Sequence, residues 1–526
     1  MNKRKIGIIA GVLCLLAVAG FFVVKMQFES NIRGTIESTL AGLPQPLAAK
    51  AEEIDVSFSD KSVTLTNLKV TYTYSLKKGD SEETIPMDYT FDRITAKGIN
   101  MDGFKEGAGT QKLVDSLVFV NAKFMSPLAQ SHVGLYTFDN ITGDFQQLYT
   151  EFAKALPVMM AANAKPEFAE RQAEQRKLMD ALAGILKAYE TVHIDKSTFE
   201  DYQYAIDFEG TKVDVHFASG QSLDASMRKM GPVVLKNMTV KTKDVEVGKL
   251  DSLSMDEIIL PSFAEFFKVL GQDAMPSRHI LQGLLKGQTF VLKNLRMKNL
   301  ETRHPLFKDT PFFTLADVDF SYTAETAHTI DFSFSNLNLP KSVLLRQSRL
   351  PAQTMAALPD VITLEGVMQQ SATPKDEGAY DAECKKIFLK GTGLGEGTLS
   401  FAISDLNFMA VMMGMPSKAA LKNFDLSLRD AGFSDVAFAI NGLYSGKSGE
   451  EARAEEVASI REELEEDPDV MGKEIIAGFA DFLEKSGNTL RIKVAPASPI
   501  SLEDAHKALL SNPETLGLSV TVTPNK

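Results

Sequence analysis

Apolar and polar residues alternate through the octet Val63-Thr64-Leu65-Thr66-Asn67-Leu68-Lys69-Val70, with one interruption. Alternation of this kind predicts a β-strand, because successive side chains of a strand point to opposite faces. Val63 and Leu65 share one parity, however, whereas Leu68 and Val70 share the other. One extra residue at Thr66-Asn67 would return all four apolar side chains to one face, and asparagine tolerates the backbone of such a β-bulge. The octet therefore predicts a bulged strand.

The octet recurs along the chain, with Asn at the same place in the alternation. Clear copies occupy residues 233–240, 290–297 and 332–339, and looser copies occupy 94–101, 253–260, 401–408 and 421–428. A β-rich chain also produces such octets by chance, but the fixed position of the Asn favours a degenerate repeat. Because bulges bend and twist a sheet, the repeats predict a strongly curved antiparallel sheet.

Helical periodicity separates and ends these strands. Pro261 and Pro340 follow two of the strands and precede short apolar stripes, which is typical of short amphipathic helices. Residues 144–190 carry a longer stripe, for which Pro157 and Pro166 predict breaks. The predicted domains are 1–25 (cytoplasmic flank and anchor), 26–53 (stalk helix and linker), 54–250 (first β-rich unit with the helical insertion 144–190), 251–447 (second β-rich unit with strand-Pro-helix repeats) and 448–526 (acidic helix, amphipathic helix and closing strands).

The N-terminus combines a basic flank with a long apolar run. Residues 1–5 include three basic side chains, and the run from Ile6 to Val24, which contains Leu15 and Phe21, has no charge. Its length suits one membrane crossing by a helix, and the basic flank predicts that the rest of the chain lies on the outer side. Ala17-Val18-Ala19 resembles a signal-peptidase site, so cleavage stays open, although the run continues past it and favours an uncleaved anchor.

The charge balance limits the classes of partner. The chain has 56 Lys and Arg against 69 Asp and Glu, a net charge of −13. An acidic protein lacks the basic surface that nucleic acid requires, and it does not favour anionic lipid headgroups. We therefore expect no nucleic acid among its partners.

Motifs for catalysis, cofactors and metals are missing from the sequence. No two of the seven histidines have the spacing of a local metal site. The segment 442–448 resembles a phosphate-binding loop but has three residues between its glycines where four are needed. The glycine-rich segment 391–397 suits a hairpin loop, and Cys384 is the one cysteine outside the apolar run. The sequence thus predicts no catalytic residue, no metal and no cofactor.

Two resemblances follow from these patterns. The basic-flanked apolar run, the short helix ending at Leu43-Pro44, residues 54–70 and the segment 91–98 resemble YdgA-type proteins of bacterial inner membranes, over about residues 1–130. The repeated octets more loosely resemble AsmA-like periplasmic proteins. The first resemblance implies a membrane-anchored, β-rich periplasmic protein, and the second implies a role in outer-membrane lipid traffic or envelope upkeep. This chain is shorter and more helical than the large AsmA-like proteins, which argues against a conduit between two membranes.

The sequence as a whole predicts an α+β fold, with an N-terminal transmembrane helix and a repeat-like region of bulged, curved antiparallel sheet with short amphipathic helices. The expected function is non-enzymatic binding of lipid or a hydrophobic peptide, by a protein anchored once in a bacterial inner membrane with its bulk in the periplasm. A structural scaffold without a groove is the alternative, and an envelope hydrolase is a third interpretation. The residues expected to line the groove are Val63, Leu65, Leu68, Val70, Leu235, Met238, Val240, Leu292 and Leu295.

Overall fold

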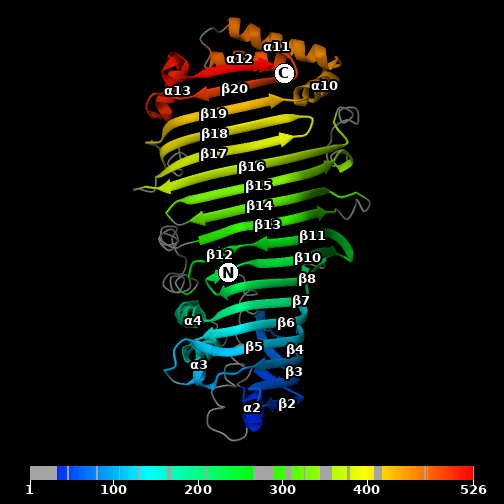
Figure 1. Cartoon of the computed structure of the whole chain (residues 1–526), viewed down its shortest axis with the longest axis vertical. Helices are drawn as coiled ribbons and strands as arrows, with labels where there is room; N and C mark the ends of the chain where they lie inside the picture. Colours follow the sequence, from blue (N-terminus) through cyan, green and yellow to red (C-terminus); the bar gives the residue numbers. More distant parts are fainter. Residues whose placement is uncertain are drawn as a thin grey trace. The chain divides into compact units, whose positions relative to one another are not determined.

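The computed structural model describes residues 32–43, 47–262, 290–303, 310–343, 358–407, 418–466 and 470–524, with gaps of one to five residues inside several of these ranges. The chain divides into two compact units, Met1–Phe290 and Val291–Lys526, whereas the sequence placed this division at 250/251. Both units consist mainly of antiparallel strands, as predicted (Figure 1). Each unit is described by itself.

The predicted membrane anchor, with Ile6, Leu15, Phe21 and Val24, lies outside the described residues. In the part of the chain that the structure describes, no helix combines the length and the apolar character of a membrane span.

The first unit is an antiparallel meander whose neighbours in space are mostly neighbours in the chain. Its strand β3 pairs with β1, β2 and β4, and the pairing then continues through β5, β6, β7, β8 and β10 to β11. The elements are α2 (Ile32–Ala41), β1 (Leu47–Lys50), β2 (Glu53–Ser57), β3 (Ser62–Lys78), β4 (Ser81–Lys97), the 3-10 helix η1 (Met101–Phe104), β5 (Gln111–Met125), β6 (Ala129–Gly143), α3 (Phe145–Ala162), α4 (Phe168–Tyr189), β7 (His193–Phe208), β8 (Thr211–Ser226), β9 (Lys229–Met230), β10 (Val233–Thr242), β11 (Val245–Met255) and β12 (Glu257–Ile259).

Helix α2 belongs to the core of this unit, although the sequence suggested a stalk. Ile36 and Leu40 are buried and pack against Leu65 and Leu68 of β3. The next residues also join the sheet, because β1 and β2 both pair with β3. The apolar spacing of Ile36 and Leu40, four residues apart, places both side chains on the face that meets the sheet.

Helices α3 and α4 form the predicted insertion and lie at the ends of the strands (Figure 1). They pack against each other, with Ala155 and Ile185 fully buried between them. The break predicted at Pro157 is wrong, because α3 continues to Ala162. Proline removes one backbone N–H bond from a helix, and the packing of α4 along α3 offsets that loss.

Asparagine and aspartate residues in the left-handed conformation interrupt alternate strands of this unit. Asn67, Asn121, Asp201 and Asn237 have φ between 49° and 53°. Each lies opposite a residue of the neighbouring strand at which that strand also reverses its side-chain alternation; we call such a set of opposite positions a rung. We call this set the Asn67 line; in strand order it comprises Asn67, Asp92, Asn121, Gly134, Asp201, Ala218, Asn237 and Asp251.

The predicted reversal of parity is confirmed, but the predicted extra residue is not. Val63, Leu65, Leu68 and Val70 all pack in one core cluster, so they share a face. The register of β3 against β4 is nevertheless the same on both sides of Asn67. Both strands reverse parity at one rung, so no residue is inserted.

A second line crosses the same strands six residues from the first. We call it the Gly98 line; it comprises Gly98, Asp115, Asn140, Asp195, Asp224, Gly231 and Glu257. Left-handed residues here fall on the other strands, at Gly98 (φ 63°), Asn140 (φ 52°) and Asp224 (φ 51°). A side chain at Gly98 would collide with Asp115, so glycine is required there.

The second unit is also a meander, in which β14 pairs with β15 and the order continues through β16, β17, β18, β19 and β20 to β22. Its elements are β13 (Phe290–Thr302), β14 (Phe313–Ala324), β15 (His328–Pro340), β16 (Val361–Pro374), β17 (Tyr380–Gly391), β18 (Gly395–Leu406), β19 (Ala420–Asp430), α10 (Phe433–Ser445), α11 (Gly449–Glu466), α12 (Lys473–Glu484), β20 (Asn488–Val494), β21 (Ile500–Ser501), α13 (Leu502–Ser511), the 3-10 helix η3 (Pro513–Leu516) and β22 (Ser519–Pro524).

In the second unit the register shifts between β15 and β16 and between each following pair up to β19, but it is unchanged between β14 and β15, where Ala316 lies on the rung of Asn336. Asn336 of β15 is left-handed (φ 51°), and the register against β16 shifts there. Similar shifts leave Lys385 of β17, Asp405 of β18 and Lys422 of β19 without an opposite residue. These are the one-residue bulges that the octets predicted, although in the copy at 421–428 the extra residue is Lys422 and not Asn423.

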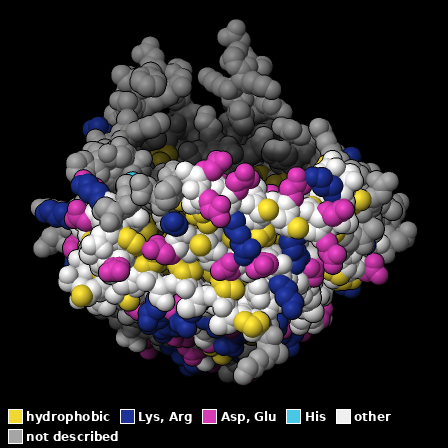
Figure 2. All heavy atoms as spheres, turned by 90° about the horizontal axis from the view of Figure 1, so that it is seen from above, with side chains coloured by type: hydrophobic (Ala, Val, Ile, Leu, Met, Phe, Trp, Pro, Cys, Tyr) yellow, Lys and Arg dark blue, Asp and Glu magenta, His cyan; other side chains and the backbone are white. Residues whose placement is uncertain are grey.

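The C-terminal strands close the sheet of this unit as their alternation predicts. Leu490 pairs with Val522 and Ile492 with Val520. Helices α10, α11 and α12 pack in sequence against one another, and α12 covers β20 and β22. Seen from this end, basic and acidic side chains alternate over the surface with apolar groups between them (Figure 2). The helices predicted after Pro261 and Pro340 lie largely outside the described residues.

Candidate functional site

One face of the first unit is apolar across its full width. Paired residues of adjacent strands point to the same side of a sheet, so the register defines rows that cross the strands. We call three neighbouring rows on this side together the apolar face; a further row on the same side begins at Val70 and Tyr89. The first is Leu65, Ile94, Phe119, Tyr136, Phe199, Gly220, Leu235 and Leu253; the second, across the Asn67 line, is Leu68, Phe91, Ala122, Val133, Tyr202, Phe217, Met238 and Leu250; the third, beside the first, is Val63, Ala96, Leu117, Phe138, Ser197, Ser222, Val233 and Met255.

Aromatic rings connect these rows from strand to strand. The ring of Phe199 lies 6.3 Å from Tyr136, 5.7 Å from Tyr202 and 6.5 Å from Phe217, each in an edge-to-face arrangement. Phe119 contacts Phe138 in the same way at 5.9 Å. Such contacts stabilise the sheet beyond the burial of apolar area. Burial also raises the pKa of the Tyr136 phenol above its ordinary value.

The apolar face is covered unevenly. At β3 and β4 it is closed by α2, so Leu68 and Phe91 are buried. From β5 onward the cover is incomplete: Leu117, Val233 and Leu250 are buried, whereas the aromatic side chains Phe119, Tyr136 and Phe217 are partly exposed. The described helices α3 and α4 pack on each other at the strand ends, and Phe145 of α3 also covers the end of the third row, where it packs with Val63 and Ala96.

The residues predicted to line a groove fall into three groups. Leu65, Leu68 and Val70 are buried under α2, with Val63 partly buried beside them, so they contribute to the core. Leu235, Met238 and Val240 are partly exposed, and the first two lie in the rows of the apolar face. Leu292 and Leu295 are half-buried in β13 of the second unit. A role in a groove stays a prediction for all of them.

The opposite face of the first unit is polar. On that face the hydroxyl oxygens of Thr64 and Thr95 lie 3.3 Å apart and form a hydrogen bond. Asp201 of the Asn67 line accepts a hydrogen bond from His216 Nε2 at 3.0 Å and lies 3.7 Å from His132 Nδ1. Hydrogen bonding from Gln203, then from His216, holds the pKa of the Asp201 carboxyl below its usual value.

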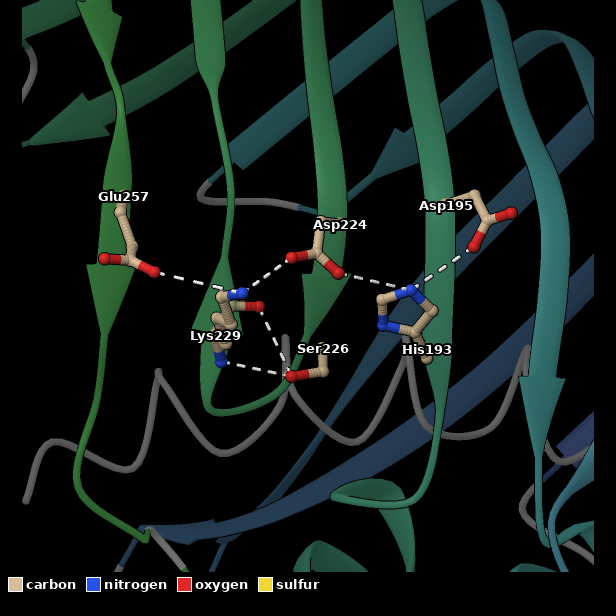
Figure 3. Close-up of polar contacts among 6 residues, drawn as sticks. All are labelled: His193, Asp195, Asp224, Ser226, Lys229 and Glu257. Atoms are coloured by element: carbon tan, nitrogen blue, oxygen red, sulfur yellow. Dashed lines mark hydrogen bonds and ion pairs between the residues drawn. The ribbon is translucent and has the colours of Figure 1, made fainter.

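The Gly98 line carries a similar group of charges (Figure 3). His193 Nε2 lies 3.3 Å from an oxygen of Asp195 and 3.4 Å from one of Asp224. Lys229 Nζ lies 2.7 Å from the other oxygen of Asp224 and 3.8 Å from Glu257. The bond from Lys229 lowers the pKa of Asp224. Three carboxylates share one lysine and one histidine, and most of these side chains are a third to a half exposed, so the group behaves as a solvated ion-pair network.

Groups suited to catalysis do not come together in the described residues. Among them, no three His, Cys, Asp or Glu side chains are placed to hold a metal ion. Cys384 is buried in β17, and this burial raises the pKa of its thiol. Residues 391–397 form the predicted β17–β18 hairpin turn. The segment 442–448 begins in the last turn of helix α10 and does not follow a strand, and its Lys447 pairs with Glu455, so the context of a phosphate-binding loop is absent there.

The aromatic part of the apolar face was missed by the sequence analysis. Phe119, Tyr136, Phe199 and Phe217 lie in strands where no octet was recognised. A local signal does exist, because Asn121 and Asp201 follow aromatic positions by two residues and adopt the left-handed backbone. A search that accepted Asp or Gly in place of Asn would have found these strands.

Comparison with known proteins adds little to these observations. A family model described as "Uncharacterized protein" matches residues 329–525, so the chain is similar to that family over most of its second unit. No curated protein and no solved structure matches the chain.

Proposed function

We propose that the chain is a non-enzymatic lipid-binding protein, and that acyl chains lie on the apolar face of its first unit. The observation that carries the proposal is the partial exposure of large apolar side chains in β5–β10. A monomeric protein seldom leaves a wide apolar surface in water, and such a surface usually serves binding. The proposal includes the anchor at residues 6–24 and a periplasmic location of the rest, for which the N-terminal pattern is the support.

Charge on the two faces also supports binding of an apolar ligand. None of the side chains of the apolar face is charged, whereas the opposite face carries the ion pairs around Asp201 and Asp224. A ligand with a long apolar body would therefore be desolvated on one side of the sheet only. A scaffold without a ligand is the competing function, and it requires that other parts of the chain cover the rows completely.

Adjacent residues of β10 offer a matched test. Leu235 belongs to the apolar face, whereas Val234 points to the other side of the same strand and pairs with Gln221. A photoreactive amino acid would replace each residue in the full chain, followed by irradiation in bacterial membranes and mass spectrometry of the adducts. We expect lipid adducts from position 235 and few or none from 234.

Two other results would reject lipid binding. Adducts with a peptide at position 235 would identify a hydrophobic protein partner. The absence of any adduct at 235, in a protein with unchanged circular dichroism, would support the scaffold.

A further inference from the structure

Three hydroxyl groups meet within the apolar face. Ser197 Oγ and Ser222 Oγ lie 2.7 Å apart on β7 and β8. The phenol of Tyr136, on β6, is a neighbour of Ser197, which lowers the pKa of the phenol against the larger, opposite effect of burial. We call Tyr136, Ser197 and Ser222 the hydroxyl trio.

Apolar groups surround the hydroxyl trio on its own side of the sheet. In their row, Ser197 is opposite Phe138 and Ser222 is opposite Val233, and every other member of the row is apolar. Phe199 and Gly220 occupy the next row beside them. Within the three rows of the apolar face the other hydrogen-bonding side chain is the phenol of Tyr202, and the next row on the same side adds Ser131 opposite Tyr204.

The hydrogen bonds inside the trio leave at least one donor over. Three hydroxyls have three O–H hydrogens, and the bond between Ser197 and Ser222 uses one of them. A second can be shared between Ser197 and Tyr136, so at least one hydrogen is left for another acceptor. Under an acyl chain this hydrogen would have no partner, and an unsatisfied donor in an apolar environment is unfavourable. A ligand with an oxygen acceptor at this position avoids that cost.

The acceptor must be uncharged. No Lys, Arg or His lies in the three rows of the apolar face. A carboxylate or phosphate placed at the trio would be removed from water without a counter-charge, which is strongly unfavourable. A carbonyl oxygen of an ester satisfies both conditions, because it accepts a hydrogen bond without charge and is joined to acyl chains.

We infer that the lipid bound on this face is an ester-linked acyl lipid, and that the hydroxyl trio receives one of its ester carbonyls. The inference rests on the proposed function and names the class of ligand. Tyr136, Ser197 and Ser222 are then specificity residues: they distinguish an ester from a hydrocarbon chain or a simple ether.

The test compares two lipids that differ in the carbonyl alone. Vesicles would contain equal amounts of a phosphatidylethanolamine, which has no net charge, with two ester-linked chains and its analogue with two ether-linked chains. The full chain would be reconstituted in these vesicles and purified, and the two lipids retained would be quantified by mass spectrometry. We expect the ester lipid to exceed the ether lipid about tenfold, the ratio that corresponds to one hydrogen bond of about 1.4 kcal/mol.

The matched variant is S197A/S222A, with Y136F as a second variant that keeps the aromatic ring. We expect the ester-to-ether ratio to fall to near one in S197A/S222A while the total lipid retained changes less than twofold. Equal retention of both lipids by the original chain, or an unchanged ratio in both variants, would overturn the ester assignment. Retention of neither lipid would instead reject the proposed function. Thermal unfolding of each variant checks that the fold is intact.

Discussion

The Asn67 line of the first unit and the β15–β16 pair of the second solve the same geometric problem in different ways. Each contains strands in which a left-handed residue reverses the side-chain parity, such as Asn67 in the first unit and Asn336 in the second. In the first unit the neighbouring strand reverses at the same rung, and the register is unchanged. In the second unit β14 keeps its register with β15, but β16 continues its own alternation, and the register between β15 and β16 shifts by one residue.

In both cases the apolar side chains of a strand stay on one face of the sheet. The pairing register between strands changes only where the neighbouring strand does not reverse at the same rung. Leu65 and Leu68 are three residues apart and face the same side, and so do their partners Ile94 and Phe91. Phe334 and Leu337 are also three residues apart, but their partners Gly366 and Leu364 are separated by two. A single irregular strand needs a bulge, whereas a line of irregular strands needs none.

The largest effect should come from deleting one residue in each kind of interruption. Deletion of Asn237 leaves β10 one residue short of both β8 and β11, so half of the strand loses its rungs. Deletion of Lys385 brings β17 into step with β16 and β18, neither of which has a matching extra residue. We expect a loss of about 3 kcal/mol or more in unfolding free energy for the first deletion and less than about 1 kcal/mol for the second.

Urea unfolding of the full chain, followed by far-UV circular dichroism, measures both deletions. Hydrogen exchange of peptides from each unit assigns each loss to its unit, because the units need not unfold together. Equal losses would mean that aligned and single interruptions are equivalent, which would contradict the comparison.

The sequence predicted the conformation of single strands better than the relation between strands. Asn67, Asn237, Asn294 and Asn336 are all left-handed, as the octets predicted. The bulge assigned to Asn67 was wrong, because a bulge is defined by the partner strand, and nothing in residues 63–70 describes β4. The same limit explains the copy at 421–428, where the register identifies Lys422 as the extra residue.

The candidate site was predictable only in part for a related reason. The octets identified Leu235 and Met238, which lie on the apolar face. Burial of Leu65 and Leu68 by α2 depends on where a separate helix packs, and the hydroxyl trio depends on the pairing of β6 with β7 and β8. Contacts between residues distant in the chain follow from the register, which local periodicity leaves open.

A second, smaller effect compares two glycines that lie under phenylalanine rings. A Cβ atom on Gly220 would lie 2.2 Å from Phe199, and one on Gly366 would lie 2.4 Å from Phe334. The ring of Phe199 is held by Tyr136, Tyr202 and Phe217, so it has little freedom to move aside. We expect Gly220→Ala to cost about 2 kcal/mol and Gly366→Ala about 1 kcal/mol of unfolding free energy.

The same urea titration measures this pair, with Phe199→Leu as the control background. If the collision causes the loss, Gly220→Ala should cost clearly less when Leu occupies position 199. An undiminished loss in that background would assign the effect to the backbone of β8 instead of the aromatic packing.

The smallest effect concerns a carboxylate in each unit and depends on pH. Asp430 of the second unit is buried; burial raises its pKa, but hydrogen bonds from Ser434 and from the amides of Gly432 and Ser434 outweigh it, so the pKa is lowered. A lowered folded-state pKa stabilises the protein above the unfolded value of about 3.9, and this stabilisation disappears as the pH falls through the folded value. We expect Asp430→Asn to cost about 1 kcal/mol of unfolding free energy at pH 7, and this difference from the original chain should shrink below about pH 4.

Asp201 of the first unit also has a lowered pKa, but its side chain is about half exposed, so Asp201→Asn should have a smaller effect on unfolding free energy over the same pH range. A difference for Asp430→Asn that stayed constant from pH 7 to pH 3 would show that the charge of this carboxylate is not what stabilises the junction of β19 with α10.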